Sequence, residues 1–164
     1  RASLRAYAVM EGEDPVAVLS DLELLLRLTE PARSATALFG YCEPALRRIT
    51  LAGAGHSPPL LLGEHRAEFV ETSVSAPLGM LACWEAPSVE VQAEPGETVL
   101  LYTDGLSESR AGDQLFGEER IANTLRRDPG AAPSVIVKSL LEAARDFARE
   151  PHNDDIAILA IRRD

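Results

Sequence analysis

Residues 98–105 read TVLLYTDG, a mostly apolar run that ends in an acidic residue and a glycine. A short run of aliphatic and aromatic residues predicts a strand that is buried inside a sheet. Pro95 and Gly96 come just before it and predict the turn that leads the chain into this strand. We therefore expect the carboxylate of Asp104 at the end of an interior strand, where rigid backbone holds it in place.

A second interior strand is predicted near the end of the sequence. Residues 153–157 read NDDIA, and the apolar residues that continue to Arg162 predict a central strand over residues 155–162. Asp154 and Asp155 open this strand. Carboxylates at the ends of two central strands can converge, and clustered carboxylate oxygens are ligands that Mg²⁺ and Mn²⁺ prefer. An ordinary turn at 104–105 and an ordinary cap at 154–155 explain the same residues, so spacing alone leaves both interpretations open.

Helices are predicted on both sides of a region that is rich in strands. Asp14 and Pro15 supply a cap and a first-turn proline for a helix that ends before Pro31. Its apolar spacing predicts a buried face made of Val16, Leu19, Leu22 and Leu26. Other helices are predicted over residues 2–12, 117–126 and 133–149, and other strands over residues 35–42, 48–54, 59–62, 67–71 and 88–92. Hairpins without regular strand–helix alternation predict a single α+β domain over residues 1–164.

Composition excludes several classes of function. The 164 residues are 46% hydrophobic, which is enough for one domain with a core. A net charge of -10 argues against a nucleic-acid-binding protein, which needs clustered cations to hold phosphates. No run approaches the roughly 18 apolar residues of a membrane helix. Cys42 and Cys83 lack the spacing of a zinc site, so we expect free, partly buried thiols in a cytoplasmic protein.

Several short motifs follow one another in a recognisable order. They are AGAGHSPP at residues 52–59, APLG at 76–79, EPGE at 94–97, LYTDGLSE at 101–108, FG at 116–117 and NDDIA at 153–157. This series resembles the PPM-type phosphatases, which are related to protein phosphatase 2C. The resemblance is specifically to their bacterial branch of the sporulation stage II protein E type, and it extends over essentially the whole chain.

The resemblance implies a fold and an activity. The fold would be an αββα sandwich, in which two antiparallel sheets are flanked by helices. The activity would be hydrolysis of phosphoserine or phosphothreonine by a water that two Mn²⁺ or Mg²⁺ ions activate, without a phosphoenzyme. The implied substrate is a phosphorylated anti-sigma-factor antagonist, a small protein of bacterial stress or sporulation signalling.

The resemblance also implies roles for individual residues. Asp104 and Asp154 match metal ligands. Asp155 would either orient Asp154 without binding the metal or replace it as a ligand. Glu108 matches an acid that touches an accessory third metal in relatives, although a solvated glutamate at the start of a helix explains it as well. His56 lies in the Gly-His-Ser-Pro turn and could orient a water or donate a proton to the leaving group. A histidine that stabilises this turn is the alternative.

The chain departs from the family pattern at its beginning. Relatives carry a strand with a Gly-Asp ligand and an Asp-Val-x-Gly-His-Gly turn upstream, and neither motif occurs here. Arg1–Met10 matches the later half of the helix that follows that turn. We therefore expect a domain without its N-terminal strands, with unpaired sheet edges that could pair with another chain, one metal ion or none, and little activity.

Three explanations of this departure are open. The protein continues upstream, or a second chain supplies the ligands, or the chain is a pseudophosphatase that binds a signalling partner without hydrolysis.

Overall fold

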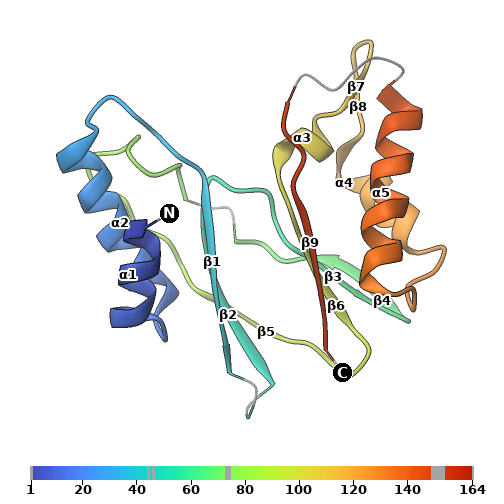
Figure 1. The fold of residues 1–164 in the computed structure, drawn as a ribbon, viewed down its shortest axis with the longest axis horizontal. Coiled ribbons are helices and arrows are strands. Elements are labelled where there is room, and N and C mark those ends of the chain that lie inside the picture. Colours follow the sequence, from blue (N-terminus) through green and yellow to red (C-terminus); the bar gives the residue numbers. More distant parts are fainter. Residues whose placement is uncertain (1, 44, 46, 73–74, 149–153, 164) are drawn as a thin grey trace. The chain divides into compact units, whose positions relative to one another are not determined.

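The structure is a computed structural model that describes residues 2–43, 45, 47–72, 75–148 and 154–163 (Figure 1). The chain divides into two compact units. Unit 1 comprises residues 1–58 and 71–92, and unit 2 comprises residues 59–70 and 93–164. We describe each unit by itself, and the single domain over residues 1–164 stays a prediction.

Unit 1 consists of a helical hairpin and a three-stranded antiparallel sheet. Helix α2 packs on β1 and β2, and the sheet order is β1-β2-β5. The Asp14 carboxylate caps α2 as predicted, because its Oδ1 accepts the backbone N–H groups of Val16 and Ala17 at 3.0 and 3.1 Å. The elements are α1 (Ala2–Glu11), α2 (Pro15–Thr29), β1 (Ala37–Glu43), β2 (Arg48–Ala54) and β5 (Val89–Gln92).

The buried face of α2 differs from the prediction. Its buried residues are Pro15, Val18, Leu19 and Glu23, so only Leu19 of the expected face is fully buried. Glu23 is buried because it accepts the backbone N–H of Gly79, while Arg27 one turn later donates to the carbonyl of Ala82. The loop that carries the APLG motif therefore packs against α2, and two polar side chains of the helix hold it there.

Gly79 has a structural requirement of its own. Its φ of +81° lies in the left-handed region, and a Cβ atom there would lie 2.2 Å from the carbonyl oxygen of Arg33. The loop is also tied to the chain before β1 by two backbone hydrogen bonds between Ala35 and Leu78, at 2.8 and 3.0 Å. The APLG motif is thus explained by close backbone packing in unit 1.

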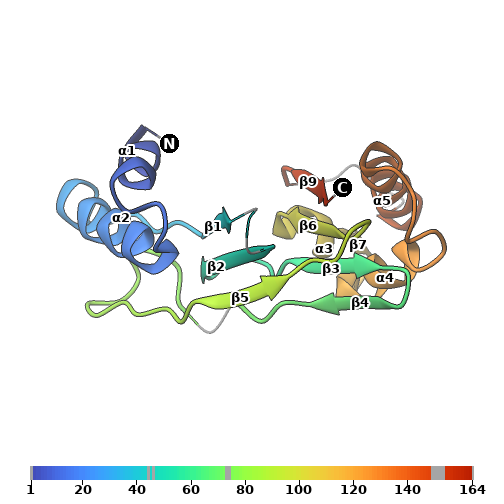
Figure 2. The ribbon, with the colours of Figure 1, turned by 90° about the horizontal axis from the view of Figure 1, so that it is seen from below.

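Unit 2 contains a four-stranded antiparallel sheet in the order β4-β3-β6-β9 and the helices that accompany it (Figure 2). Helix α5 contacts β9 and α4 contacts β4 and α5, which encloses a core of leucine, isoleucine and phenylalanine side chains. The elements are β3 (Leu60–Gly63), β4 (Arg66–Phe69), β6 (Thr98–Tyr102), α3 (Asp104–Ser107), β7 (Arg110–Ala111), β8 (Gln114–Leu115), α4 (Gly117–Leu125), α5 (Pro133–Ala148) and β9 (Ile158–Arg162).

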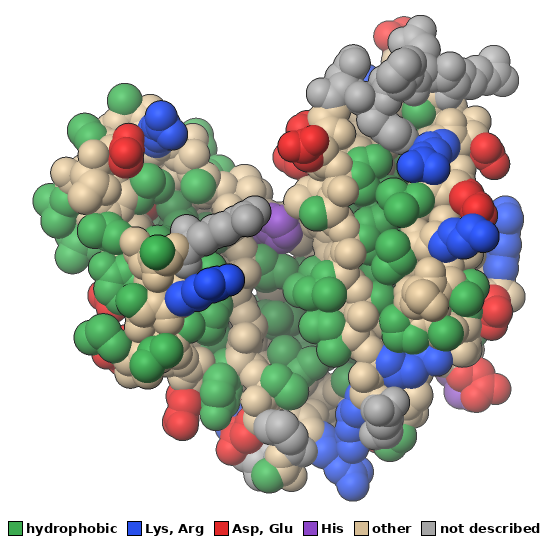
Figure 3. Space-filling view, in the orientation of Figure 1, with side chains coloured by type: hydrophobic (Ala, Val, Ile, Leu, Met, Phe, Trp, Pro, Cys, Tyr) green, Lys and Arg blue, Asp and Glu red, His purple; other side chains and the backbone are tan. Residues whose placement is uncertain are grey.

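The two strands predicted as interior behave differently. Strand β6 is almost entirely buried between β3 and β9, as predicted. Strand β9 is an edge strand of the sheet as far as the structure describes it, with Leu159 and Ile161 54% and 49% exposed. The prediction of a central strand over residues 155–162 is therefore wrong, because β9 begins only at Ile158 and, among the described residues, pairs with β6 alone. Its side chains alternate between the core and solvent. Figure 3 shows hydrophobic side chains over the part of unit 2 where β9 runs.

The EPGE motif forms the turn that leads into β6. Gly96 has a φ of +86°, and Glu97 accepts the backbone N–H of Glu94 at 2.7 Å. The Glu97 carboxylate also forms an ion pair with Arg66 of β4, in which Nε–Oε1 is 2.7 Å and Nη2–Oε2 is 2.5 Å. The hydrogen bonds from Arg66 lower the pKa of Glu97 below its ordinary value. The motif therefore fastens the β3–β4 hairpin to the start of β6.

The structure confirms the α+β class and corrects some details. The two cysteines are free as predicted, but both are exposed rather than partly buried. Helix α3 and the β7–β8 hairpin were not predicted. Among the described residues, no helix combines the length and the apolar character that crossing a bilayer requires.

Candidate functional site

Thr103 joins the ends of β6 and β9 in unit 2. The two strands pair up to Tyr102 and Ile158, and the contact continues because the Thr103 N–H donates to the carbonyl of Ala157 at 3.0 Å. The Thr103 hydroxyl donates to the carbonyl of Asp155 at 3.0 Å and accepts the N–H of Ala157 at 2.9 Å. One side chain thus bridges the segment that precedes Asp104 and the segment that follows Asp154.

Gly105 allows these two segments to touch. A Cβ atom at this position would lie 2.5 Å from the carbonyl oxygen of Asp155 and 3.0 Å from its carbonyl carbon. Carbon and oxygen atoms that are not bonded do not approach so closely, so a larger residue would push the segments apart. Thr103 therefore connects the two segments by hydrogen bonds, and Gly105 allows their backbones to touch. Asp104 lies between these two residues in the sequence.

The carboxylates are oriented by local hydrogen bonds and face solvent. Oδ1 of Asp104 accepts the N–H of Gly105 at 3.0 Å, and Oδ1 of Asp154 accepts the N–H of Asp155 at 2.8 Å. The side chains of Asp104, Asp154 and Asp155 are all exposed. Exposed carboxylates on adjoining strand ends fit a hydrated Mg²⁺ or Mn²⁺ ion, which keeps several waters and few protein ligands.

The described residues do not complete a metal centre. Within residues 2–148 and 154–163, apart from the short undescribed stretches, no group of three His, Cys, Asp or Glu side chains could hold a metal ion. Asn153 of the NDDIA motif lies outside the described residues. The structure therefore brings the Asp104 and Asp154–Asp155 segments together, and their role as ligands stays a prediction.

Glu108 and His56 were singled out from the sequence as further candidates. Glu108 is exposed and follows α3, with its N–H bonded to the carbonyl of Asp104 at 2.7 Å, so it ends a helix rather than starting one. His56 is half-buried and belongs to unit 1, just after Gly55, whose φ is +61°. A Cβ atom on Gly55 would lie 2.5 Å from Cγ of Pro77, so the AGAGHSPP turn packs tightly on the APLG motif.

Sequence reasoning missed Thr103 and Gly105 as the residues that hold the site together. Threonine before an acidic turn was a visible signal, but its partners at 155 and 157 follow only from the register of β9 with β6. Tyr102, the neighbouring residue, was also missed. Its hydroxyl is buried without a hydrogen-bond partner among the described residues, and burial raises the pKa of Tyr102 above its ordinary value.

Comparisons with known proteins identify relatives of this chain. The family model of Stage II sporulation protein E (SpoIIE) matches residues 1–164. Phosphoserine phosphatase RsbP of Bacillus subtilis is 27% identical over 150 residues, which are 88% of this chain and 36% of RsbP. The chain thus spans about a third of that relative's length.

Solved structures share the fold. The SiaA-PP2C domain of Pseudomonas aeruginosa has a TM-score of 0.87 at 24% identity, over 99% of this chain and 66% of that one. The catalytic domain of the serine/threonine protein phosphatase PstP, in complex with two manganese ions, has a TM-score of 0.65 at 16% identity over 97% of this chain and 78% of that one. These likenesses confirm the predicted α+β sandwich class. The chain therefore belongs to the Stage II sporulation protein E family, the SpoIIE branch of the PPM-type phosphatases.

Proposed function

We propose that this protein is a metal-dependent phosphatase that hydrolyses phosphoserine or phosphothreonine on another protein. The observation that carries the proposal is the contact at Gly105, which places Asp104 directly beside the Asp154–Asp155 segment. Family membership and the likeness to a protein named as a phosphoserine phosphatase support the reaction type.

In this proposal, Asp104 and Asp154 hold a Mn²⁺ or Mg²⁺ ion, and Asp155 supports Asp154 or takes its place. The cation would supply positive charge to the phosphoryl oxygens and make water a better nucleophile. The task of the chain is to hold the carboxylates rigidly and in contact with solvent. Glu108 would reach an accessory cation and His56 would orient a water, and both of these roles remain separate predictions.

The number of bound ions follows from the number of carboxylates. Two carboxylate segments meet in the described part of unit 2. In this proposal they would hold one ion weakly, because Mg²⁺ can bind through one or two carboxylates and several waters. A catalytic pair of ions needs further acidic side chains, from elsewhere in the protein or from a second chain. We therefore propose two ions in the active domain and one or none on residues 1–164 alone, with little turnover by this segment.

The proposed substrate is a phosphorylated bacterial signalling protein of the anti-sigma-factor antagonist type. This part of the proposal rests on the resemblance to the SpoIIE branch. The carboxylates of Asp104, Asp154 and Asp155 are exposed, so a phosphorylated side chain of a folded protein could reach them.

The test is Mn²⁺-dependent hydrolysis of p-nitrophenyl phosphate and of a phosphoserine peptide by the intact protein. We expect Asp104→Asn and Asp154→Asn each to lower kcat by about 100-fold or more, because each removes a ligand charge. Asp113→Asn is the matched control, since Asp113 is an exposed aspartate of unit 2 outside the site. Equal activity of Asp104→Asn and Asp113→Asn would overturn the assignment.

The same experiment addresses the alternative of a pseudophosphatase. Absence of Mn²⁺-dependent turnover by the intact protein, with phosphoprotein binding that survives Asp104→Asn, would favour a docking module. The lack of a three-ligand group among the described residues is the observation that keeps this second candidate in view.

A further inference from the structure

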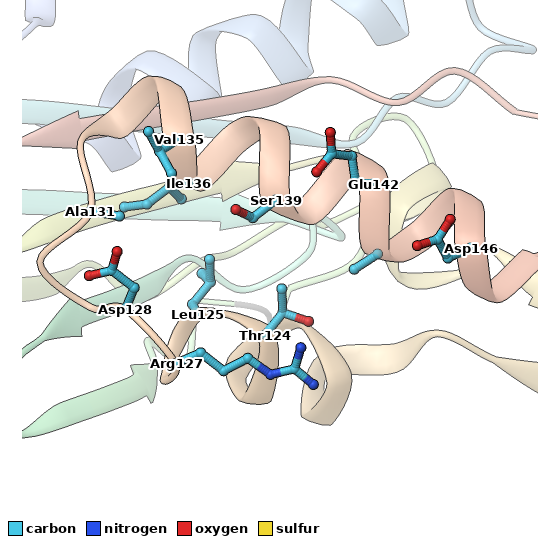
Figure 4. A pocket seen from close by; sticks show the side chains of 11 residues that line it. Thr124, Leu125, Arg127, Asp128, Ala131, Val135, Ile136, Ser139, Glu142 and Asp146 are labelled. Carbon is cyan, nitrogen blue, oxygen red and sulfur yellow. The ribbon is translucent and has the colours of Figure 1, made fainter.

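A groove of about 330 Å³ runs between α4 and α5 in unit 2 (Figure 4). One wall is a face of α5 formed by Val135, Ser139, Glu142 and Asp146. The last three residues follow Val135 by four, seven and eleven positions, so all four lie on one face of the helix. Such a face extends over about 16 Å, since an α-helix rises about 1.5 Å per residue. The opposite wall is formed by the end of α4 and the turn after it, with Thr124, Leu125, Arg127 and Asp128.

The floor of the groove is apolar and its shape is held from behind. Leu125 and Ile136 are 3% and 1% exposed and belong to the core of unit 2, whereas Val135 at the rim is 48% exposed. The turn between the helices is fixed by Arg162 of β9, which donates to the carbonyl groups of Gly130 and Ala131. A groove that is already formed requires little ordering when a partner binds.

The rim of the groove is acidic at both ends. Figure 4 shows Asp128 beside Ala131 at one end and Glu142 and Asp146 toward the other. Arg127 is the single cationic side chain among the residues that line the groove, and Glu142 forms an exposed ion pair with Lys138 at 3.7 Å. The whole chain, which includes the groove, carries a net charge of -10. This field attracts a cationic partner and repels a phosphorylated or otherwise anionic one.

We propose that this groove docks a short amphipathic helix of a partner protein, with a leucine-sized side chain between lysine or arginine residues. The apolar side chain would pack on Val135, Ala131 and Ala143, the apolar lining residues that keep exposed surface, and the basic residues would face Asp128 on one side and Glu142 and Asp146 on the other. Asp128 lies at the end of the groove where Val135 begins the α5 wall (Figure 4), and Glu142 and Asp146 follow Val135 by 7 and 11 residues, which is two to three turns. The basic residues of the partner are therefore spaced by about 7 to 11 positions. The groove contains none of the residues assigned to phosphate hydrolysis, so the two proposals can fail independently.

The probe is a fluorescein-labelled synthetic helix of 15 residues with leucines on one face and lysines at those spacings, measured by fluorescence anisotropy. Its twin carries glutamate in place of every lysine. We expect the lysine peptide to bind, the glutamate peptide not to bind, and binding to weaken at high salt. Amide shifts in a ¹⁵N spectrum are expected at Ala131, Ser139 and Ala143.

Two matched double variants distinguish the effect of the groove carboxylates on peptide binding from the effect of the protein's overall charge. Asp128→Asn with Asp146→Asn is expected to weaken binding about five-fold, because two exposed ion pairs are lost. Asp113→Asn with Glu119→Gln removes the same charge from unit 2 outside the groove and is expected to change binding by less than about two-fold. Ser139→Arg places a bulky cation in the middle of the groove and is expected to abolish binding, with circular dichroism as the check of folding.

Three results would overturn the proposal: no binding of the lysine peptide at millimolar concentration, equal binding of its glutamate twin, or equal losses in the two double variants. Shifts confined to residues outside the groove would overturn it as well. These results would leave the phosphatase proposal untouched, since they do not involve Asp104.

Discussion

The substitution Gly105→Ala tests the contact on which the candidate site depends. The new methyl group would start 2.5 Å from the carbonyl oxygen of Asp155, whereas ordinary contacts begin at 3.4 Å. The two segments must therefore separate by about 1 Å, since atoms in a packed site cannot overlap.

The cost of that separation can be worked out from the hydrogen bonds that cross the contact. The Thr103 hydroxyl makes two of them, to Asp155 and Ala157, and the Thr103 N–H makes a third. If relaxation weakens these bonds, each contributes about 1 kcal/mol, and overpacking alone costs about 1–3 kcal/mol. We expect Gly105→Ala to lower the free energy of unfolding by about 2–4 kcal/mol.

The assay is urea denaturation followed by circular dichroism, combined with Mn²⁺ titration of the folded protein. Gly130→Ala is the control, because its Cβ would meet only the Asp128 carboxylate at 4.0 Å. We expect this control to change stability by less than about 0.5 kcal/mol. The reasoning is refuted if Gly105→Ala unfolds at the same urea concentration as Gly130→Ala and binds Mn²⁺ equally well.

The remaining predictions concern single side chains of unit 2. Thr103→Val is expected to lose about 2 kcal/mol of stability in thermal melts, because both hydroxyl hydrogen bonds disappear, while Thr103→Ser retains most of it; equal losses in the two variants would contradict the bridging role. Glu97→Gln is expected to cost about 1–2 kcal/mol at pH 7. Because the pKa of Glu97 is lowered in the folded state, this contribution is present above the ordinary value of 4.5 and is lost as the pH falls through the folded pKa. The gap between wild type and Glu97→Gln in urea should therefore close in acid, and a gap that widens would show the opposite sign. Tyr102→Phe is expected to leave stability unchanged or raise it by up to about 1 kcal/mol, because it removes a buried hydroxyl that has no hydrogen-bond partner among the described residues. A loss of more than about 1 kcal/mol would show instead that the hydroxyl forms a stabilising hydrogen bond.

Local signals predicted most of the elements well. The cap at Asp14 involves atoms within three residues, and strand β2 covers residues 48–54 as predicted, because its pattern and its turn are both local. The Asp-Gly after β6 could also be recognised as a strand end, whereas β9 begins at Ile158, three residues after the acidic pair. What these features share is that the deciding atoms lie close together along the chain.

The missed features depend on contacts between distant segments. Glu23 is charged and would be placed on the surface from its type, yet it is buried because Gly79, far along the chain, donates to it. Strand β9 is apolar from Ile158 to Ile161, and only the structure shows that it lies at an edge of the described sheet, with Leu159 and Ile161 exposed. Likewise, the sequence around Thr103 could draw attention to this residue but could not predict its partners Asp155 and Ala157, because they follow from the register of β9 with β6.

The central claim is that Asp104 and the Asp154–Asp155 segment approach one cation. The most direct measurement is a Mn²⁺ titration followed in ¹⁵N spectra, because the paramagnetic ion broadens only nearby amides. We predict that the amides of Gly105 and Asp155 broaden together at the same Mn²⁺ concentration, and that Asp104→Asn removes both effects. Broadening of one amide while the other stays sharp, or of neither at millimolar Mn²⁺, would contradict the account.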